Sequence, residues 1–425
     1  MSWRDGPRPV RMERVALVAP TTAFRPMLEH VGDVGLVELE PPEIEPTREA
    51  ELQRRAAQAV VRGHVSAVVG WTPASARPGL ADELAPWGAA AVPLTPPRGV
   101  QPPTLLRRNR GARSFDLLVE TYTTVPYTNV DPTLLAGLAY VAMFGMMFGD
   151  VGHGMLLVVA ALLVRSGRIR RLVRVRRAWP FLAGAGATAM VFGFLYGEMF
   201  GPTGLIPVLW LAPLEEPVVL LVAAVGVGAL LLAGAYVLGT INRVREGGWG
   251  YALYARTGIA GSLLFLALGL LAGGIYLGAG ALTAAAAVLG VVGLVLAFVG
   301  LLMTAGRGAA GVLQAVVELF DLVLRLGSNL VSFARLAAFG LTHAALGAIV
   351  WTGTTALWGP GFSALAAVLL FVVGNAVAFT LEGLVAGIQA LRLEYYELFS
   401  RVFDVEGRPF RPWKLPTNEK AEVTA

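Results

Sequence analysis

The sequence predicts an α-helical polytopic membrane protein with about eight transmembrane helices and a small N-terminal α/β cytoplasmic lobe. Hydrophobic residues make up 56% of its 425 residues, whereas charged residues make up only 15%. From near residue 133 onward, apolar runs recur that are long enough to cross a bilayer as helices. This composition is typical of a polytopic helical membrane protein rather than of a soluble globular protein.

Residues 1–130 are expected to form a shortened cytoplasmic α/β lobe that ends in a proline-rich linker. No apolar segment near residue 1 has the length of a cleavable signal, so nothing at this end directs the lobe across a membrane. Its strands and helices are predicted from hydrophobic alternation and from turn residues. Strand, helix and strand are expected at 14–20, 24–32 and 34–42 and again at 66–73, 76–88 and 89–97, with a helix at 47–63 between the two halves.

Residues 131–405 are expected to form the transmembrane domain, followed by a cytoplasmic tail at 406–425. The first two apolar segments share one stretch that is broken at "GDVGHG". The last two exceed about 30 residues, which predicts strong tilt or extension past the bilayer. The eight segments lie at 133–149, 152–165, 179–200, 216–241, 257–279, 281–305, 312–357 and 362–400.

Loop charge predicts the orientation of these spans. The loops at 165–177 and 242–256 carry seven and three arginines, whereas the loops 201–217, 276–282 and 352–361 carry none. Cytoplasmic loops hold the excess of basic residues. We therefore expect both termini to be cytoplasmic in a multi-pass protein, for which a bacterial plasma membrane is suitable.

Several kinds of chemistry are excluded by what the sequence lacks. There is no cysteine, so thiolate metal sites and cysteine nucleophiles are absent. Lysine occurs only at 414 and 420, and no phosphate-binding G-x-x-x-x-G-K-[ST] motif exists. We expect a subunit that is not itself an enzyme, with no cofactor, no metal site and no nucleic-acid partner.

Polar residues recur every seven positions on the last two apolar segments, which places them near one face of each helix. A charged side chain at mid-membrane costs about 2.5–3.5 kcal/mol, so each needs a partner or a water-filled cavity. On the seventh segment these residues are Asp321, Ser328, Arg335 and Thr342, flanked by Ser332 and His343, and on the eighth they are Asn375, Glu382 and Gln389, followed by Arg392.

If the two faces meet, Glu382 can compensate one arginine, and a carboxylate from another chain is required for the second. Arginine stays protonated, but it lowers the pKa of a nearby carboxylate by about 1–3 units and so forces proton release there.

More ordinary interpretations stay open. Arg325, Arg392 and Glu394 could reach the membrane interface, and Asp321 could pair with Arg325 along the helix surface. Arg335 and Glu382 could form a structural ion pair, and His343 could be a hydrogen-bonded interior residue.

The glycine-rich motifs at 148–154 and 192–201 are expected to allow close helix packing or tight reversal rather than ligand binding. Asp150, His153 and Glu198 are expected to satisfy these turns and line a cavity mouth rather than to carry protons.

Four membrane motifs stand out, "AMFGMMFGDVGHGMLL", "VFGFLYGEMFG", "SNLVSFARLAAFGLTHAAL" and "AFTLEGLVAGIQALRLEYYELFSRVF", together with the lobe segments 12–39 and 68–84. These motifs and segments resemble the a/I subunit (116 kDa subunit) family of V-type and A-type rotary ATPases. The approach to the first span, 102–133, is also similar to that family.

The resemblance implies a membrane stator with two proton half-channels that meet a rotating ring of c-type proteolipid subunits. It places Arg335 on the family's essential arginine and Arg392 on the second arginine. Glu382 falls on a buried half-channel glutamate, His343 on a modulating histidine, and Gln389 on a variable polar position. Implied partners are the rotor ring, the other V/A-type subunits including central and peripheral stalks, and the lipid bilayer.

The soluble half departs from the family pattern. Members usually carry a long coiled coil and a distal lobe that binds the peripheral stalks, whereas only about one short helix joins the two halves here. Two other functional classes therefore stay open: a stand-alone ion channel or secondary transporter derived from this fold, and a membrane anchor that transports nothing.

Overall fold

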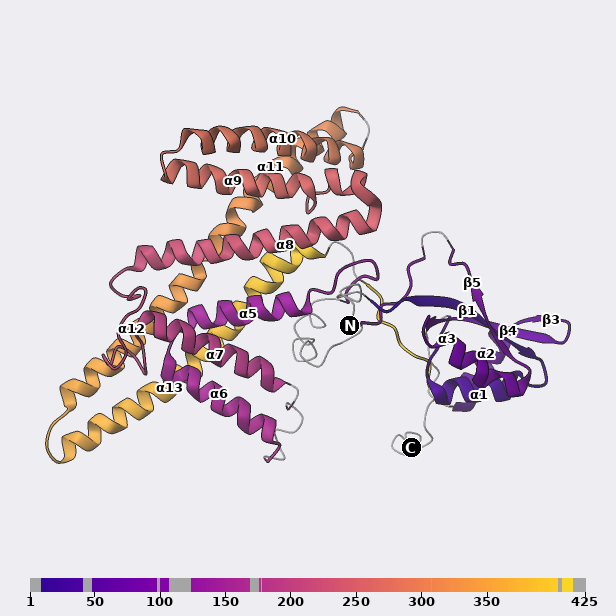
Figure 1. The fold of residues 1–425 in the computed structure, drawn as a ribbon, viewed down its shortest axis with the longest axis horizontal. Helices are drawn as coiled ribbons and strands as arrows, with labels where there is room; N and C mark the ends of the chain where they lie inside the picture. Colours follow the sequence, from indigo (N-terminus) through magenta and orange to yellow (C-terminus); the bar gives the residue numbers. More distant parts are fainter. Residues whose placement is uncertain are drawn as a thin grey trace. The chain divides into compact units, whose positions relative to one another are not determined.

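The computed structural model describes residues 9–40, 48–97, 100–106, 124–168, 176, 178–306, 308–403 and 407–415 (Figure 1). They belong to two compact units, which we call the sheet unit and the helical unit. The sheet unit draws on Met1–Arg107, Thr123–Asp131 and Val405–Ala425, and the helical unit on Arg108–Tyr122 and Pro132–Asp404. Parts of several predicted features lie outside the described residues: 41–42 of the second predicted strand, Thr47 of the next helix, 98–99 and 107–123 in the linker and before the first span, 169–175 and 177 in the arginine-rich loop, and 406 and 416–425 in the tail.

The sheet unit confirms the predicted order of strands and helices. Its strands are β1 (Met12–Pro20), β2 (Glu38–Leu39), β3 (Val60–Arg62), β4 (Val65–Pro73) and β5 (Ala90–Leu94), and its helices are α1 (Phe24–Val34), α2 (Arg48–Gln58), α3 (Arg77–Leu84) and the 3₁₀ turn η2 (Ala85–Trp87). The order β2-β4-β1-β5, with antiparallel neighbours throughout, interleaves the two strand–helix–strand halves as a split βαβ arrangement. The end of the helix expected at 47–63 is instead the short strand β3.

The core of the sheet unit includes residues from the far end of the chain. Val15, Leu17 and Ala19 alternate along β1 and point into this core, as a half-buried strand requires. Trp413 is inserted into the same core, and its Nε1 donates to Glu51 Oε1 at 2.7 Å. Its backbone N also donates to Val37 O at 2.7 Å, so residues near 413 are an integral part of this unit.

The helical unit is built from long apolar helices. They are α5 (Thr133–Met147), α6 (Val151–Ser166), α7 (Trp179–Tyr196), α8 (Pro217–Tyr254), α9 (Ile259–Tyr276), α10 (Gly280–Thr304), α11 (Ala309–Ser332), α12 (Ala334–Leu357) and α13 (Phe362–Leu393), which continues into η5 (Glu394–Phe399) and α14 (Ser400–Val402). By length and composition, five described stretches can cross a membrane: α7, α8, α9, α10 and Phe362–Val402. The helices α5 and α6 are apolar but shorter. The count of eight spans stays a prediction.

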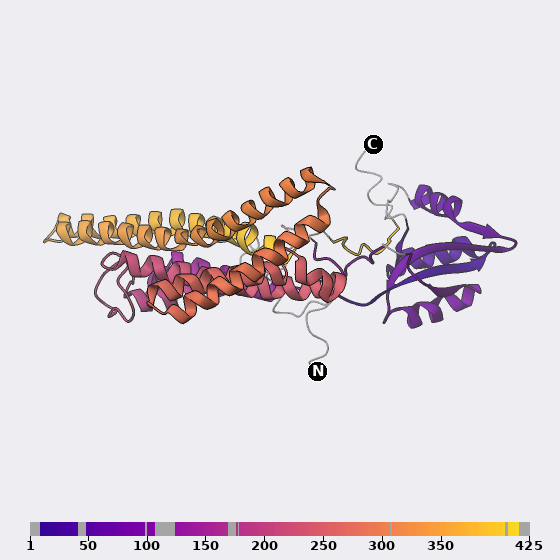
Figure 2. The ribbon, with the colours of Figure 1, turned by 90° about the horizontal axis from the view of Figure 1, so that it is seen from above.

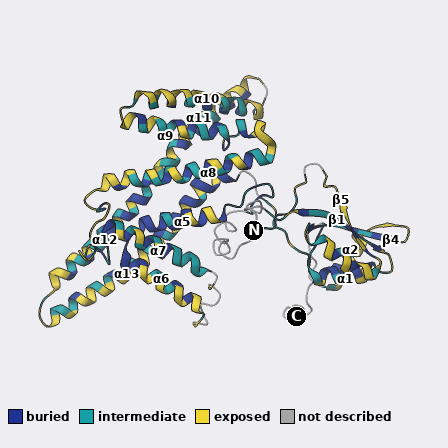
Figure 3. Ribbon diagram, viewed as in Figure 1, coloured by how far each residue is buried: buried dark blue, intermediate teal, exposed yellow. Residues whose placement is uncertain are grey.

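Large apolar side chains are exposed along the long helices of the helical unit, where exposed positions recur in the ribbon coloured by burial (Figure 3). Leu230 is 74% exposed on α8, and Met303 is 71% exposed on α10. Soluble proteins rarely leave so much contiguous apolar surface in water, whereas lipid chains cover it at no cost. The helical unit is that of a multi-pass membrane protein.

The seventh predicted segment is not one continuous helix. The helix α11 ends at Ser332 and α12 begins at Ala334, with Phe333 at the break. The first packs against α10 and α8, whereas the second packs along α13, α8 and α5. In both views α12 and α13 lie side by side as a long hairpin (Figures 1 and 2). Phe333 keeps nearly helical dihedrals (φ −73°, ψ −12°). The seven-residue repeat of polar residues therefore continues across the break and does not reveal it.

The glycines of the two motifs pack helices closely, as predicted. A Cβ at Gly193 of α7 would lie 2.4 Å from Val151 N and 2.6 Å from Asp150 C. A Cβ at Gly154 of α6 would lie 2.7 Å from the carbonyl oxygen of Gly186. Because these neighbours are backbone atoms, they cannot rotate away. Glycine at these positions therefore sets the distance between α6 and α7.

We expect Gly193→Ala to destabilise the helical unit by about 1–3 kcal/mol, because the added methyl group overlaps backbone at the start of α6. The measurement is thermal unfolding of the full chain in detergent. Gly226→Ala on α8 is the matched control, since a Cβ there has no atom within 4 Å. Equal midpoints for the two variants would contradict the packing argument.

Candidate functional site

His343 and Glu382 form a short contact between α12 and α13. The distance from His343 Nδ1 to Glu382 Oε2 is 2.5 Å, and the two side chains are 5% and 15% exposed. The expectation that Glu382 compensates an arginine is therefore wrong. The two polar faces do meet, but the glutamate pairs with the neighbouring histidine because that residue, not Arg335, lies opposite it on the antiparallel helix.

Asp150 holds the reversal between α5 and α6. As the residue before α6, it accepts a hydrogen bond from His153 N at 2.8 Å through Oδ1, which caps the helix. Its Oδ2 accepts from Gly201 N at 2.9 Å, in the turn that follows α7. The prediction that Asp150 satisfies the turns is thus confirmed.

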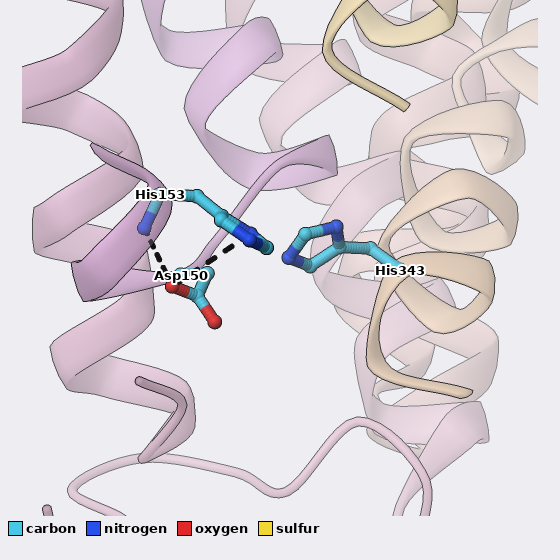
Figure 4. A group of neighbouring side chains, drawn as sticks. All are labelled: Asp150, His153 and His343. Carbon is cyan, nitrogen blue, oxygen red and sulfur yellow. Dashed lines mark hydrogen bonds and ion pairs between the residues drawn. The ribbon is translucent and has the colours of Figure 1, made fainter. Parts of the chain in front are cut away.

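These turns also bring Asp150 and His153 to the His343–Glu382 pair. The imidazole rings of His153 and His343 lie edge to face, with centroids 5.5 Å apart and an interplanar angle of 72° (Figure 4). Asn375 and Glu198 are buried beside them and interact electrostatically with the cluster. We call the following set the histidine cluster: Asp150, His153, Glu198, His343, Asn375 and Glu382.

Sequence reasoning assigned Asp150, His153 and Glu198 to turns and missed that they share a cluster with His343. The only signal was their position in motifs that interrupt apolar segments. Polar groups at such positions cost free energy unless they have polar partners or line a water-filled cavity. Imidazole and carboxylate groups in one buried cluster can bind and release protons.

Arg335 lies at a different level of the same helix pair. The helices α12 and α13 are antiparallel, and Val350 contacts Gly374 while His343 contacts Glu382. This register places Arg335 opposite the helical turn of α13 near residue 390. That level is about 12 Å from the histidine cluster, at 1.5 Å per residue. Arg335 is half-buried, and among the described residues no carboxylate lies within 4.0 Å of it.

The charges that act on Arg335 are Arg392 and Glu397. Arg392 is exposed on α13, and the interpretation that it reaches a membrane interface stays a prediction. Glu394 is 1% exposed, so that interpretation is wrong for this residue. Glu394 is the first residue of the π-helical turn η5, in which Glu397 is also buried.

Glu397, Arg401 and Asn329 form a polar group near Arg335 that sequence reasoning missed. In the amide orientation that satisfies its neighbours, Asn329 donates to Glu397 Oε2 at 3.0 Å and accepts from Arg401. Ser332 donates to the same carboxylate. The spacing of Glu397 and Arg401, four residues apart, was the signal in the sequence that could have indicated this group. It was missed because both residues lie beyond the seven-residue repeat of polar positions, which ends at Gln389.

The other predicted residues are scattered. Gln389 is half-buried at the level of Arg335, and its Oε1 has no hydrogen bond among the described residues. Asp321 and Ser328 are exposed on α11, and Asp321 pairs with Arg325 at 2.7 Å, as the ordinary interpretation predicted. Thr342 is exposed, and its hydroxyl donates to Ala338 O of its own helix. Asp321 and Ser328 lie on α11, outside the α12–α13 hairpin, whereas Thr342 directly precedes His343 on α12.

Comparison with known proteins identifies similar chains. Residues 64–172 match the sequence model of the V-type ATPase 116kDa subunit family. An A-type ATP synthase subunit I from Aeropyrum pernix is 30% identical over 352 residues, which is 71% of this chain and 50% of that protein. The protein of the same name from Methanocaldococcus jannaschii is 29% identical over 367 residues, 77% of this chain and 51% of that protein.

A bacterial protein is similar over a shorter stretch. V-type ATP synthase subunit I 2 of Treponema pallidum is 35% identical over 147 residues, 32% of each chain. The present chain spans about half the length of the two archaeal relatives.

We expect Asp150→Ala to lower the stability of the helical unit by about 2–4 kcal/mol, because the α6 cap and the acceptor for Gly201 N are lost together. Asp150→Asn keeps one acceptor oxygen and should lose about half as much. Thermal unfolding in detergent measures both variants. An unchanged midpoint for Asp150→Ala would show that other groups hold the reversal.

Proposed function

We propose, from the premise that this chain belongs to the V-type ATPase 116kDa subunit family, that it is the ion-translocating membrane stator of a V/A-type rotary ATPase or ATP synthase. In this proposal the chain binds no nucleotide. It forms proton half-channels against a ring of c-type subunits, and Arg335 drives deprotonation of the rotor carboxylate.

The observation that carries the proposal is the uncompensated charge of Arg335. A guanidinium in an apolar bundle costs about 2.5–3.5 kcal/mol on insertion scales. Glu382 pairs with His343, so that carboxylate does not offset the charge. Glu397 acts on Arg335 only beyond ion-pair distance and is shared with Asn329. A carboxylate carried past on a rotor subunit would supply the missing anion.

A second cation strengthens the effect on such a carboxylate. Arg392 acts on Arg335 from the adjacent helix, so two guanidinium groups contribute to one positive region. A carboxylate near this region is held ionised, because an adjacent cation lowers its pKa by about 1–3 units. Since arginine does not release its own proton, it blocks direct transfer between the two half-channels.

The histidine cluster is a suitable half-channel. It places three carboxyl groups and two imidazoles, of Asp150, Glu198, Glu382, His153 and His343, inside the helical unit. Such groups exchange protons readily near neutral pH when they are neighbours. Ser332, Ser328 and Asp321 lead along α11 toward Arg335, and we assign them to the second half-channel. Thr342 and Gln389 would contact the passing rotor surface.

The remaining predicted organisation belongs to the same proposal. Residues 1–130 would be a cytoplasmic lobe, 131–405 the translocation domain, and 406–425 a cytoplasmic tail. Both termini would lie on the cytoplasmic side of a bacterial plasma membrane. The rotor ring and the central-stalk and peripheral-stalk subunits would be partners. Between the two halves of the lobe, the described residues form only α2 and β3, and we propose that another subunit holds this stator against rotation.

We expect Arg335→Ala to abolish ATP-driven proton pumping in membrane vesicles that contain the assembled complex, because the rotor carboxylate then keeps its proton. Arg165→Ala is the control: this arginine packs on Trp179 at the end of α6, and its loss should leave pumping near the wild-type rate. A pH-sensitive dye measures uptake, and copurification of the rotor subunits measures assembly.

Two outcomes would contradict the stator proposal. One is normal pumping by Arg335→Ala. The other is ion uptake by the purified chain alone in liposomes, which would support the stand-alone channel or transporter instead.

We expect Glu382→Gln to slow pumping about tenfold or more, because the amide can still contact His343 but cannot carry a proton. Glu318→Gln on α11 is the matched control, since Glu318 lies outside the cluster in an ion pair with Arg256. Wild-type rates for Glu382→Gln would remove the histidine cluster from the proton path.

A further inference from the structure

We propose that Asp150, His153 and His343 form a binding site for a divalent transition metal ion such as Zn²⁺. Each residue offers one ligand atom, and these atoms lie within 4.8 Å of one another. They come from the α5–α6 reversal and from α12, and all three residues are buried (Figure 4). Two imidazoles and one carboxylate are a ligand set that Zn²⁺ uses in proteins, with a fourth position left open.

The contact between His343 and Glu382 prepares the histidine as a ligand. With Nδ1 donating to Glu382 Oε2 at 2.5 Å, the lone pair of the ring is on Nε2. Metal-binding histidines commonly have this arrangement, in which a carboxylate fixes the tautomer and raises the basicity of the other nitrogen. Glu382 is therefore a positioning residue for this site.

His153 is the second ligand. It is 2% exposed, and neither ring nitrogen makes a hydrogen bond of normal geometry with the described residues, although the Asn375 amide lies nearby. A buried nitrogen without a partner costs about 1–3 kcal/mol, so a ligand for it is expected. Figure 4 shows its ring directed at that of His343.

Asp150 supplies the carboxylate. Its two oxygens each accept one backbone N–H, from His153 and Gly201, which holds the group in place and leaves further lone pairs. The distance from Asp150 Oδ1 to His153 Nδ1 is 3.8 Å. Ligands about 2.0–2.1 Å from Zn²⁺ lie roughly 3.3 Å apart in a tetrahedron. Small side-chain rotations therefore close the site around the ion.

Aromatic rings pack around the two histidines. Phe148 lies 4.9 Å from the His343 ring and 5.6 Å from the His153 ring, measured between centroids. Phe200 and Phe379 lie 5.4 Å and 5.8 Å from His153. A hydrophobic shell of this kind strengthens the interaction of a cation with its ligands.

The test uses the full chain in detergent, without affinity-tag histidines, after removal of metal with a chelator. The chain has four histidines, and His30 and His64 are outside the cluster. In the background His30→Ala/His64→Ala, the only imidazoles left are those of the proposed site. We expect one Zn²⁺ per chain by calorimetry, and loss of that binding in His153→Ala made in the same background.

Spectroscopy on the background protein decides the question even if His153→Ala does not fold. Zinc X-ray absorption should show two imidazoles at about 2.0–2.1 Å. Glu382→Gln should weaken binding by about 10–100-fold, as removal of a partner that orients a ligand does. No binding by the background protein, an oxygen-only shell, or unchanged affinity of a folded His153→Ala variant would each overturn the proposal.

A consequence for transport rests on the proposed function. Bound Zn²⁺ would occupy the imidazoles of the histidine cluster and block proton passage, so micromolar Zn²⁺ should inhibit pumping by the assembled complex. Zn²⁺ binding without any inhibition would leave the metal site intact and contradict the assignment of this cluster to a half-channel. The two failures are thereby distinguishable.

Discussion

The short contact between His343 and Glu382 determines which charges in the helical unit are compensated. It fixes the register of α12 against α13, and it assigns the carboxylate of α13 to a histidine. The guanidinium of Arg335 is consequently left at another level of the hairpin, without a carboxylate at ion-pair distance in the described structure. The proposed stator mechanism requires an arginine without a permanent carboxylate partner. A permanently paired arginine would not attract a rotor carboxylate.

The same contact connects the hairpin to the reversal between α5 and α6. Glycines at 154 and 193 let α6 and α7 approach closely enough for the turn at Asp150 to be enclosed. The ring of His153 then lies edge to face with that of His343, and Phe148 packs against both. In our proposals, this one set of buried groups passes protons in the assembled complex or holds a metal ion. The two proposed uses would compete, since a proton and Zn²⁺ bind the same nitrogen lone pairs.

Two backbone irregularities place the polar residues near Arg335. The break at Phe333 turns the chain so that α11 leaves the α12–α13 hairpin and packs on α10. The π-helical turn at Glu394–Phe399 adds a register shift, which buries Glu397 next to Asn329 and Arg401. Both occur where charged and polar side chains gather, a common position for such irregularities.

The sequence by itself determined the helical membrane class, the strand and helix order of the lobe, and the faces that carry Arg335, His343 and Glu382. These follow from local hydrophobicity and helical spacing, which act within one segment. Only the tertiary structure decided that Glu382 pairs with His343, that Asp150 and His153 join them, and that Trp413 fills the core of the sheet unit. Those contacts join segments far apart in the chain, and their partners are selected by packing between helices rather than by any local pattern.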